Sequence, residues 1–300
     1  MATPKKLLTG KNLFVALERG ETEKVRLMLQ GRPQLVKSAD EMGWTPLHWA
    51  AYDGQYQLAR WLVEQGAVLD AICNEGWAPL HLAIQEGSKV VTDFLIKAGA
   101  NVDLSTSGKV TPLHVAANDG RLEEAALLLD AGARVDPRSE EQLTPLHFAA
   151  EEGHADLVAL LLRHGAAIDA RDVEQLTPLH LAVGRDRRDV TRVLLEHKAN
   201  VNLPDKHAWT ALHLAAFQGR EALVGVLLEH RPEVNAKGPD GCTALHLAAA
   251  EGRDGIVARL LAAGAQPHML DDRGGTPLDH AEASEQAAVI QRLRQAGRAH

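Results

Sequence analysis

The stretch GWTPLHWAAYDG at residues 43–54 decides the fold, because its tetrapeptide TPLH returns unchanged at 111–114, 144–147 and 177–180. The histidine of this motif recurs at a constant spacing of 33 residues, and Asp279 takes the next place in the series. A fixed period of this length is typical of a repeat protein in which each unit packs on its neighbours. The histidines stand at positions 48, 81, 114, 147, 180, 213 and 246.

Each repeat predicts a pair of short helices. Thr45 is a suitable N-cap, and Pro46 suits the first helical position, where no backbone N–H is needed. Gly54 can adopt the left-handed conformation that ends the first helix. Residues 55–65 carry apolar side chains at helical spacing and predict a second helix that ends at Gly66. The polar residues that follow predict a hairpin-like loop that leads to the next repeat.

The pattern G-x-T-P-L-H-x-A-A-x-x-G, followed by a leucine-rich run such as LVALLLRHGA at 157–166, resembles the ankyrin repeat family. The resemblance implies an all-α solenoid of stacked helix-turn-helix units with β-hairpin-like loops. We expect an N-terminal tail at 1–11, an N-terminal capping repeat at 12–39, seven full repeats at 40–270 and a C-terminal capping repeat at 271–300. Because one repeat cannot bury its own apolar face, the charged terminal units are expected to cap a continuous core.

Composition and charge exclude several classes of partner. The net charge of −8 disfavours non-specific binding to nucleic acid. The sequence contains neither the ~18 consecutive apolar residues of a membrane span nor the apolar core of a signal peptide. Cys73 and Cys242 form no CxxC pair, so neither a zinc site nor a disulfide framework is indicated. We therefore expect a monomer in the cytoplasm, the nucleus or both, with no membrane or nucleic-acid partner.

The repeated histidines are predicted to be architectural. Equivalent side chains on packed helices lie about 8–10 Å apart, whereas zinc needs ligands within ~2.1 Å, so two of these histidines cannot share a metal ion. The resemblance implies that each histidine bonds to the Thr at the helix start and to backbone groups of the adjoining loop. No G-x-S-x-G, P-loop or HExxH motif is present, and we predict no enzymatic activity, metal or cofactor.

A second series of histidines, also 33 residues apart, is expected at the ends of second helices. Imidazolium is favoured at a helix C-terminus by the macrodipole. A stabilising or neutral surface role is therefore predicted, and a modest pH sensitivity is the alternative. The series consists of His164, His197 and His230.

Variable positions are expected to carry the function. In ankyrin-like arrays the concave face is lined by the loop tip before each Thr and by the two residues before the Gly that ends the first helix. With the residues three and four before the Thr added, the first four full repeats contain twenty such places, which hold nine acids and no Lys or Arg, whereas composition alone predicts about three acids. The last three repeats are nearly balanced in charge. We therefore expect the N-terminal half of the groove to be acidic.

The candidate partner-binding residues combine aromatic and apolar side chains with acids, which is typical of binding hot spots. Trp44, Trp77 and Tyr52 are expected to supply most of the affinity, while the acids speed and select encounters. The expected partner is an extended or helical protein segment that carries Lys or Arg among apolar residues. The alternative is that the acids only solubilise the face and the tryptophans pack against neighbouring loops. The candidates are Glu41, Met42, Trp44, Tyr52, Asp53, Glu75, Trp77, Glu86, Val110, Asp119, Leu143, Glu151, Glu152, Leu176, Arg185, Trp209 and Phe217.

Some residues depart from the repeat. Asp186, Lys198 and Arg231 replace glycines at helix ends, and a left-handed non-glycine residue costs about 1–2 kcal/mol. Residues 172–237 are therefore predicted to show a local change of curvature or early hydrogen exchange, unless these loops adopt another turn. Asn202 and Asn235 resemble sites at which ankyrin repeats are hydroxylated by an asparaginyl hydroxylase. Both are equally explained as hydrogen-bonding loop residues.

The sequence thus predicts an adaptor or scaffold that binds a partner protein on its concave face. It is either a free-standing adaptor or the recognition domain of a larger chain, such as a kinase or a death-domain protein. The alternatives are a regulatory subunit or inhibitor that occludes an enzyme, a mechanical spacer, and an engineered ankyrin binder. The irregular turns at positions 186, 198 and 231 argue against an idealised design.

Overall fold

The computed structural model describes residues 10–297, with side chains from residue 12 onward. These residues form α-helices and short 3₁₀ helices, and no β-strand occurs among them. Residues 1–9 of the predicted tail and residues 298–300 lie outside the described range. The elements are α1 (Gly10–Glu18), α2 (Thr22–Gly31), η2 (Pro33–Lys37), α3 (Pro46–Tyr52), α4 (Tyr56–Glu64), α5 (Pro79–Gln85), α6 (Lys89–Lys97), α7 (Pro112–Asn118), α8 (Leu122–Asp130), α9 (Pro145–Glu152), α10 (Ala155–Arg163), α11 (Pro178–Gly184), α12 (Arg188–Glu196), α13 (Ala211–Phe217), α14 (Glu221–Glu229), η3 (Pro239–Gly241), α15 (Ala244–Ala250), α16 (Asp254–Ala262), α17 (Pro277–Ala283) and α18 (Ala287–Ala296).

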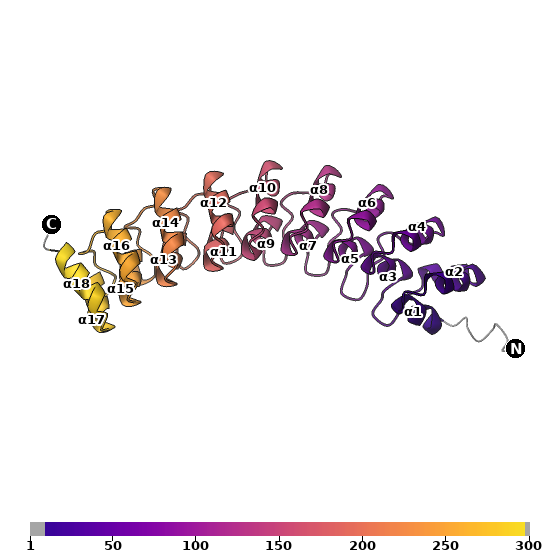
Figure 1. Cartoon of the computed structure of the whole chain (residues 1–300), viewed down its shortest axis with the longest axis horizontal. Helices are drawn as coiled ribbons and strands as arrows, with labels where there is room; N and C mark the ends of the chain where they lie inside the picture. The colour runs from indigo at the N-terminus through magenta and orange to yellow at the C-terminus, as the bar shows by residue number, and fades with distance from the viewer. Residues whose placement is uncertain (1–9, 298–300) are drawn as a thin grey trace. The chain divides into compact units, whose positions relative to one another are not determined.

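The chain forms two compact units, which divide between residues 140 and 141. In unit 1 the first helices of the repeats, α1, α3, α5 and α7, pack in one row, and α4, α6 and α8 pack in a second row (Figure 1). Unit 2 has the same arrangement, with α9 to α17 (odd numbers) in one row and α10 to α18 (even numbers) in the other (Figure 1). The predicted all-α solenoid of helix-turn-helix units is confirmed.

Helix ends follow the local chemistry of the repeat. Thr45 precedes α3 in an extended conformation, and its hydroxyl oxygen accepts a long hydrogen bond of 3.4 Å from the backbone N–H of His48. Gly54 (φ 64°) follows α3, and Gly66 (φ 84°) follows α4, so both glycines adopt the left-handed conformation expected of them. The first described helix begins at Gly10, two residues before the expected start of the capping repeat.

The loops are hairpin-like, as predicted, although they contain no strand. The backbone N–H of Cys73 donates to the carbonyl of Trp77 at 2.9 Å, which closes the loop before α5. The N–H of Asn74 donates to the carbonyl of Met42 at 3.0 Å, which joins this loop to that of the preceding repeat. Successive loops therefore form a continuous layer beside the first helices.

The core lies between the two rows of helices. Leu47 and Ala50 of α3 and Leu58 and Leu62 of α4 are at most 1% exposed, and the equivalent residues of the other full repeats are also buried. Alanine at positions such as 50 lets adjacent first helices approach closely. Burying a leucine side chain contributes about 1.5–3 kcal/mol, so the repeated leucines are the main source of stability.

The three glycine replacements do adopt left-handed conformations, and the alternative of another turn is wrong. The φ angles are 57° at Asp186, 70° at Lys198 and 52° at Arg231. Left-handed non-glycine residues also occur outside residues 172–237, for instance Lys109 (φ 58°) and Glu285 (φ 56°). Strained positions are therefore spread along the array, and early hydrogen exchange of 172–237 stays a prediction.

Candidate protein-interaction surface

Most of the repeated histidines are hydrogen-bonded on both ring nitrogens, whereas the buried Nε2 of His81 has no partner among the described residues. Nδ1 of His48 accepts from the Thr45 N–H at 3.0 Å and from the Thr45 hydroxyl at 2.8 Å. Because Nδ1 accepts, Nε2 carries the proton, and it donates to the carbonyl of Trp77 at 3.0 Å. The bond to the backbone of the next repeat makes this side chain a link between repeats. The architectural prediction is confirmed for His48, and His180 makes the equivalent bonds.

Burial keeps these histidines neutral. It lowers the pKa of His48, His180 and His213, and it lowers the pKa of His81 to about 4. A neutral imidazole with both nitrogens engaged offers neither a free base nor a metal ligand. The location of the binding site at the variable positions stays a prediction.

Three aromatic side chains cluster at the start of the array. The ring of Trp44 lies 5.0 Å from that of Trp49 and 5.3 Å from that of Tyr52, between ring centroids. Trp49 and Tyr52 are 6.5 Å apart in an edge-to-face arrangement. Tyr52 is 40% exposed, whereas the two tryptophans are half-buried. The cluster brings two predicted binding residues together with Trp49, which was not predicted.

A groove of about 770 Å³ lies beside this cluster. We call it the N-terminal groove; its lining residues are Phe14, Val15, Glu18, Ser38, Ala39, Asp40, Glu41, Met42 and Trp49. Two apolar side chains of the lining are exposed, Val15 by 40% and Met42 by 56%. Glu41 and Met42 were predicted as site residues, whereas the α1 residues were missed because the terminal unit lacks the TPLH motif that marks the register.

Asp40 holds the loop of the groove against α3. Its Oδ1 accepts from the backbone N–H groups of Met42 at 2.9 Å and Trp44 at 2.8 Å. Its Oδ2 accepts from Nε1 of Trp49 at 3.0 Å. The carboxylate thus fixes the exposed loop and the aromatic cluster relative to each other. The sequence signal for Trp49 was its place in the opening stretch, directly after the repeated histidine.

The predicted acids of unit 1 are not paired with any described lysine or arginine side chain of the protein. Among the described side chains, those of residues 12–297, no lysine or arginine forms an ion pair with these carboxylates; they belong to Glu41, Asp53, Glu75, Glu86 and Asp119. Burial raises the pKa of Asp53, and the nearby Glu86 carboxylate adds to the rise. Negative charge is therefore crowded at the end of α3. We call the N-terminal groove together with Trp44, Tyr52, Asp53 and Glu86 the acidic aromatic surface.

The predicted acids of unit 2 are paired. Glu151 accepts two hydrogen bonds from the Arg185 guanidinium, the shorter of 2.6 Å. Glu152 lies 3.7 Å from Arg187, which is not among the predicted residues. Three predicted binding residues thus make ion pairs within the unit, two of them with each other. The excess of acids counted along the sequence is partly neutralised here.

The predicted apolar binding residues that directly precede the first helix-capping residue of a repeat are half-buried. This holds for Trp77, which lies edge-to-face on His81 with ring centroids 5.6 Å apart, and for Val110 in unit 1. In unit 2 it holds for Leu143, Leu176 and Trp209. Trp209 packs edge-to-face on Phe217 at 5.5 Å, and Phe217 is 43% exposed. These side chains both pack on neighbours and retain a solvent-facing part.

Comparison with known families decides the identity of the repeats. The family described as "Ankyrin repeats (3 copies)" matches residues 13–106, 93–172 and 168–238, and "Ankyrin repeats (many copies)" matches 227–281. The chain belongs to the ankyrin repeat family. Ankyrin repeats are modules for binding other proteins, so the coarse prediction of an interaction module holds.

Similar curated proteins share only a short region with this ankyrin array. "Palmitoyltransferase akr1" of Schizosaccharomyces pombe is 38% identical over 61 residues, which are 20% of this chain and 10% of that protein. "Palmitoyltransferase AKR1" of Yarrowia lipolytica is 41% identical over 59 residues, 20% of this chain and 8% of that protein. The chain thus matches about a tenth of the length of these relatives. Between residues 10 and 297, no helix is long and apolar enough to cross a membrane.

The two asparagines have a structural role in the ankyrin loops. Oδ1 of Asn202 accepts from the backbone N–H of Glu233 at 2.8 Å, and Oδ1 of Asn235 accepts from that of Gln266 at 2.9 Å. In earlier repeats an aspartate does the same, as Asp70 does for Asn101 at 2.9 Å. The loop hydrogen-bonding explanation is confirmed, and hydroxylation stays a prediction.

The second histidine series stands at the C-caps of α10, α12 and α14, as expected, and its members His164, His197 and His230 are all exposed. Nδ1 of His197 lies 2.8 Å from the carbonyl oxygen of Val193 in the last turn of α12, which also accepts the backbone N–H of His197 at 3.1 Å. This contact supports a helix-capping role for the series.

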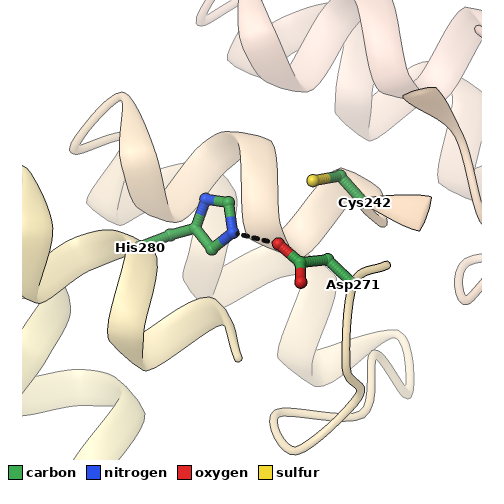
Figure 2. Close-up of side chains that lie close together, drawn as sticks. All are labelled: Cys242, Asp271 and His280. Atoms are coloured by element: carbon green, nitrogen blue, oxygen red, sulfur yellow. Dashed lines mark hydrogen bonds and ion pairs between the residues drawn. The ribbon is translucent and has the colours of Figure 1, made fainter. Parts of the chain in front are cut away.

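One cluster of metal-ligating side chains occurs among the described residues, and the sequence did not suggest it. Cys242, Asp271 and His280 place one donor atom each within 4.8 Å of the other two. Figure 2 shows the three side chains pointing toward one another from the loop after η3, the loop before α17 and α17 itself. Burial raises the pKa of the Cys242 thiol. The hydrogen bond from His280 lowers the pKa of Asp271 to about 2.

Proposed function

We propose that this ankyrin array binds another protein through the acidic aromatic surface of unit 1. The bound segment carries an apolar side chain that enters the N-terminal groove and lysine or arginine residues that meet the acids. The partner surface thus lies in unit 1, and the bound segment is basic. The difference in charge pairing between the predicted acids of unit 1 and unit 2 carries this proposal.

The unpaired carboxylates support a basic partner. An acid that already bonds an arginine, as Glu151 does, has little attraction left for a partner's cation. Glu41 and Glu86 have no such bond with any side chain of residues 12–297, so their charge is available to a partner. Charges of this kind mainly raise the association rate and select partners by sign. We therefore expect association to slow as the salt concentration rises.

The exposed apolar side chains support an anchor residue. Val15 and Met42 lie on the same groove as Trp49, and each is at least 40% exposed. A leucine-sized side chain buried there would contribute about 1.5–3 kcal/mol. Methionine adapts its shape to different partners, which suits a binding groove.

The proposal is tested by selecting peptides from a random displayed library on the full chain and measuring their affinities. We expect the selected peptides to combine Lys or Arg with large apolar residues. The variant Val15→Ser/Met42→Ser is expected to weaken them at least about tenfold, which corresponds to 1.4 kcal/mol. The variant Glu41→Lys/Glu86→Lys is expected to slow association most strongly at low salt. Exposed side chains are chosen because Trp44 supports the fold through the aromatic cluster.

Asp130→Lys is the matched control. Asp130 is exposed, lies in the same unit at the end of α8, and is not among the acids of the proposed surface. Like each substitution of the double variant, it replaces one negative charge by a positive one, and it places a cation at a helix C-terminus, where it is favourable. Binding should be unchanged. Selected peptides that lack basic residues, or that bind the groove variant as well as the original chain, would reject the proposal.

A further inference from the structure

The last pair of ankyrin repeats departs from the others at two positions that are otherwise apolar. The position of Cys242 in the repeat holds Trp, Val or Leu in the preceding repeats, and that of His280 holds Trp, Leu, Val or Phe. The equivalents of Cys242 are Trp44, Trp77, Val110, Leu143, Leu176 and Trp209, and those of His280 are Trp49, Leu82, Val115, Phe148, Leu181, Leu214 and Leu247. The other repeats thus act as an internal reference. In the last pair of repeats the thiol of Cys242 and the imidazole of His280 therefore replace two side chains that are apolar in the other repeats.

These two residues meet beside a carboxylate that is already oriented. Oδ1 of Asp271 accepts from the backbone N–H groups of Gly275 at 2.7 Å and Arg273 at 2.9 Å, which fixes the carboxyl group on its loop. Oδ2 faces His280 and lies 2.8 Å from its Nε2. Oδ2 can therefore change partner without loss of the loop hydrogen bonds.

The cluster is sheltered from solvent. Cys242 is 7% exposed and Asp271 is 8% exposed, while His280 is only partly buried. A further histidine, His246, lies nearby, with its ring 5.3 Å from that of His280. It is not a candidate ligand, because its Nδ1 accepts from Thr243 and its Nε2 contacts two backbone carbonyls. The candidate donor set is therefore one sulfur, one oxygen and one nitrogen.

We propose that Cys242, Asp271 and His280 bind a zinc ion, with a water molecule as the fourth ligand. Zinc prefers thiolate, imidazole and carboxylate ligands in a tetrahedral arrangement, whereas Mg²⁺ and Ca²⁺ prefer oxygen alone. Tetrahedral donors about 2.0–2.3 Å from zinc lie roughly 3–4 Å from one another. The three donors already lie within 4.8 Å of one another, so side-chain adjustments suffice to close the site.

The protons and charges of this step balance. Zinc binding removes the proton from the Cys242 thiol to solvent, while Asp271 binds as its carboxylate. His280 carries its proton on Nε2 when it donates to Asp271. For Nε2 to bind zinc, this proton is released to solvent and Nδ1 takes one up, so the neutral imidazole changes tautomer and the metal replaces the hydrogen bond to Asp271. One thiolate and one carboxylate neutralise the charge of Zn²⁺. A buried site with no net charge avoids the cost of an uncompensated ion.

The ion would join the last full repeat to the C-terminal capping repeat. Cys242 precedes α15, whereas Asp271 and His280 belong to the capping repeat that contains α17 and α18. A ligand that binds only the folded state stabilises it, so zinc should raise the melting temperature of the array. The site thus serves the end of the array that lies in unit 2, apart from the proposed partner surface.

The test uses the full chain without a polyhistidine tag and Co²⁺ as a spectroscopic probe for zinc. We expect one equivalent of Co²⁺ to produce a thiolate-to-metal charge-transfer band, and Zn²⁺ to displace it. The variants Cys242→Val and His280→Leu carry residue types that other repeats use at these positions, so both should fold. Each should lose the band, weaken zinc binding at least about tenfold and lose the zinc-dependent rise in melting temperature.

Cys73→Val is the matched thiol control. Cys73 is equally buried, at 7% exposed, but it belongs to no three-donor cluster among residues 10–297. This variant should keep the band. A further variant, Asp271→Asn, retains an acceptor for the loop and should weaken binding without unfolding the cap. The proposal is overturned if the original chain gives no thiolate band with excess Co²⁺, or if the band survives in Cys242→Val and disappears in Cys73→Val.

Discussion

The indole Nε1 of Trp49 donates to Oδ2 of Asp40 at 3.0 Å, which ties the loop before α3 to the helix itself. The same positions seven repeats later hold His280 and Asp271, whose Nε2 and Oδ2 lie 2.8 Å apart. In the repeats between them the helix position is aliphatic or phenylalanine, so it offers no donor for such a bond. At this pair of positions a polar loop-to-helix bond therefore occurs once in each unit among the described residues, and in unit 1 it supports the wall of the N-terminal groove.

Trp49→Phe should loosen the N-terminal groove. The phenyl ring keeps the aromatic contacts with Trp44, but it leaves Oδ2 of Asp40 without its donor. Loss of one hydrogen bond to a half-buried carboxylate should cost about 1–2 kcal/mol. Hydrogen exchange of the Met42 and Trp44 amides, which Asp40 also holds, is expected to accelerate. Tyr52→Phe is the control, and equal acceleration in both variants would argue against a specific role for the Asp40 bond.

Ala78→Thr should stabilise the second full repeat. In this repeat the N-cap is alanine, and Nδ1 of His81 accepts only from the Ala78 N–H, at 3.2 Å. In the preceding repeat Thr45 adds a hydroxyl bond of 2.8 Å to the equivalent histidine. The added cap and bond should raise the free energy of unfolding by about 1 kcal/mol. Thr111→Ala should lower it by a similar amount in urea unfolding, and a stabilising effect of that change would contradict the explanation.

The helices of the ankyrin repeat could be predicted because they depend on local chemistry. Thr45, Pro46, Gly54 and Gly66 determine where helices begin and end, and each acts within a few residues of itself. The function of the repeated histidine could be predicted for the same reason, since Thr45 and His48 are three residues apart. Only the bond from His48 to Trp77 crosses to the next repeat.

The candidate surface was predicted less well because it depends on contacts between repeats. Counting acids along the chain treated Glu151 and Glu41 alike, but Glu151 meets Arg185, which is 34 residues away. Side-chain length and direction decide such pairs, and the repeat pattern does not report them. The cluster of Cys242, Asp271 and His280 matches no local metal motif. It becomes visible only when the repeats are aligned and the two apolar positions are compared.

Stability should fall below neutral pH because buried histidines resist protonation in the folded state. Burial lowers the folded-state pKa of His48, His180 and His213, and lowers that of His81 to about 4. In the unfolded state the pKa is about 6.5, so the unfolded chain takes up protons first as the pH falls. The stabilisation is fully present above about pH 6.5 and is lost as the pH falls toward the folded-state values. For His81 alone the loss approaches about 3 kcal/mol.

Urea unfolding at about pH 7.5 and about pH 5 measures this effect, because carboxylates mostly titrate below that range. His81→Gln should reduce the pH dependence, although it also lowers stability at every pH. The control is Leu58→Val in the core, which lowers stability but removes no titratable group and should leave the pH dependence unchanged. A free energy of unfolding that stays constant over this range would contradict the assignment of the buried histidines as neutral.

Lys198→Gly should stabilise the end of α12. Lys198 follows the C-cap residue His197 and adopts a φ of 70°, whereas the equivalent position of the preceding repeat is Gly165 with a φ of 85°. Removing a side chain from the left-handed conformation should raise the free energy of unfolding by about 1–2 kcal/mol. Glycine also has more conformational freedom in the unfolded chain, which offsets part of this gain and leaves roughly 0.5–1 kcal/mol. The reverse change, Gly165→Ala, tests the conformational cost alone, because an added Cβ there would meet no atom within 4 Å. Urea unfolding and hydrogen exchange of the adjoining loop should show gains for the first variant and losses for the second. If Lys198→Gly instead destabilises the array, the lysine side chain contributes a contact that outweighs its backbone strain.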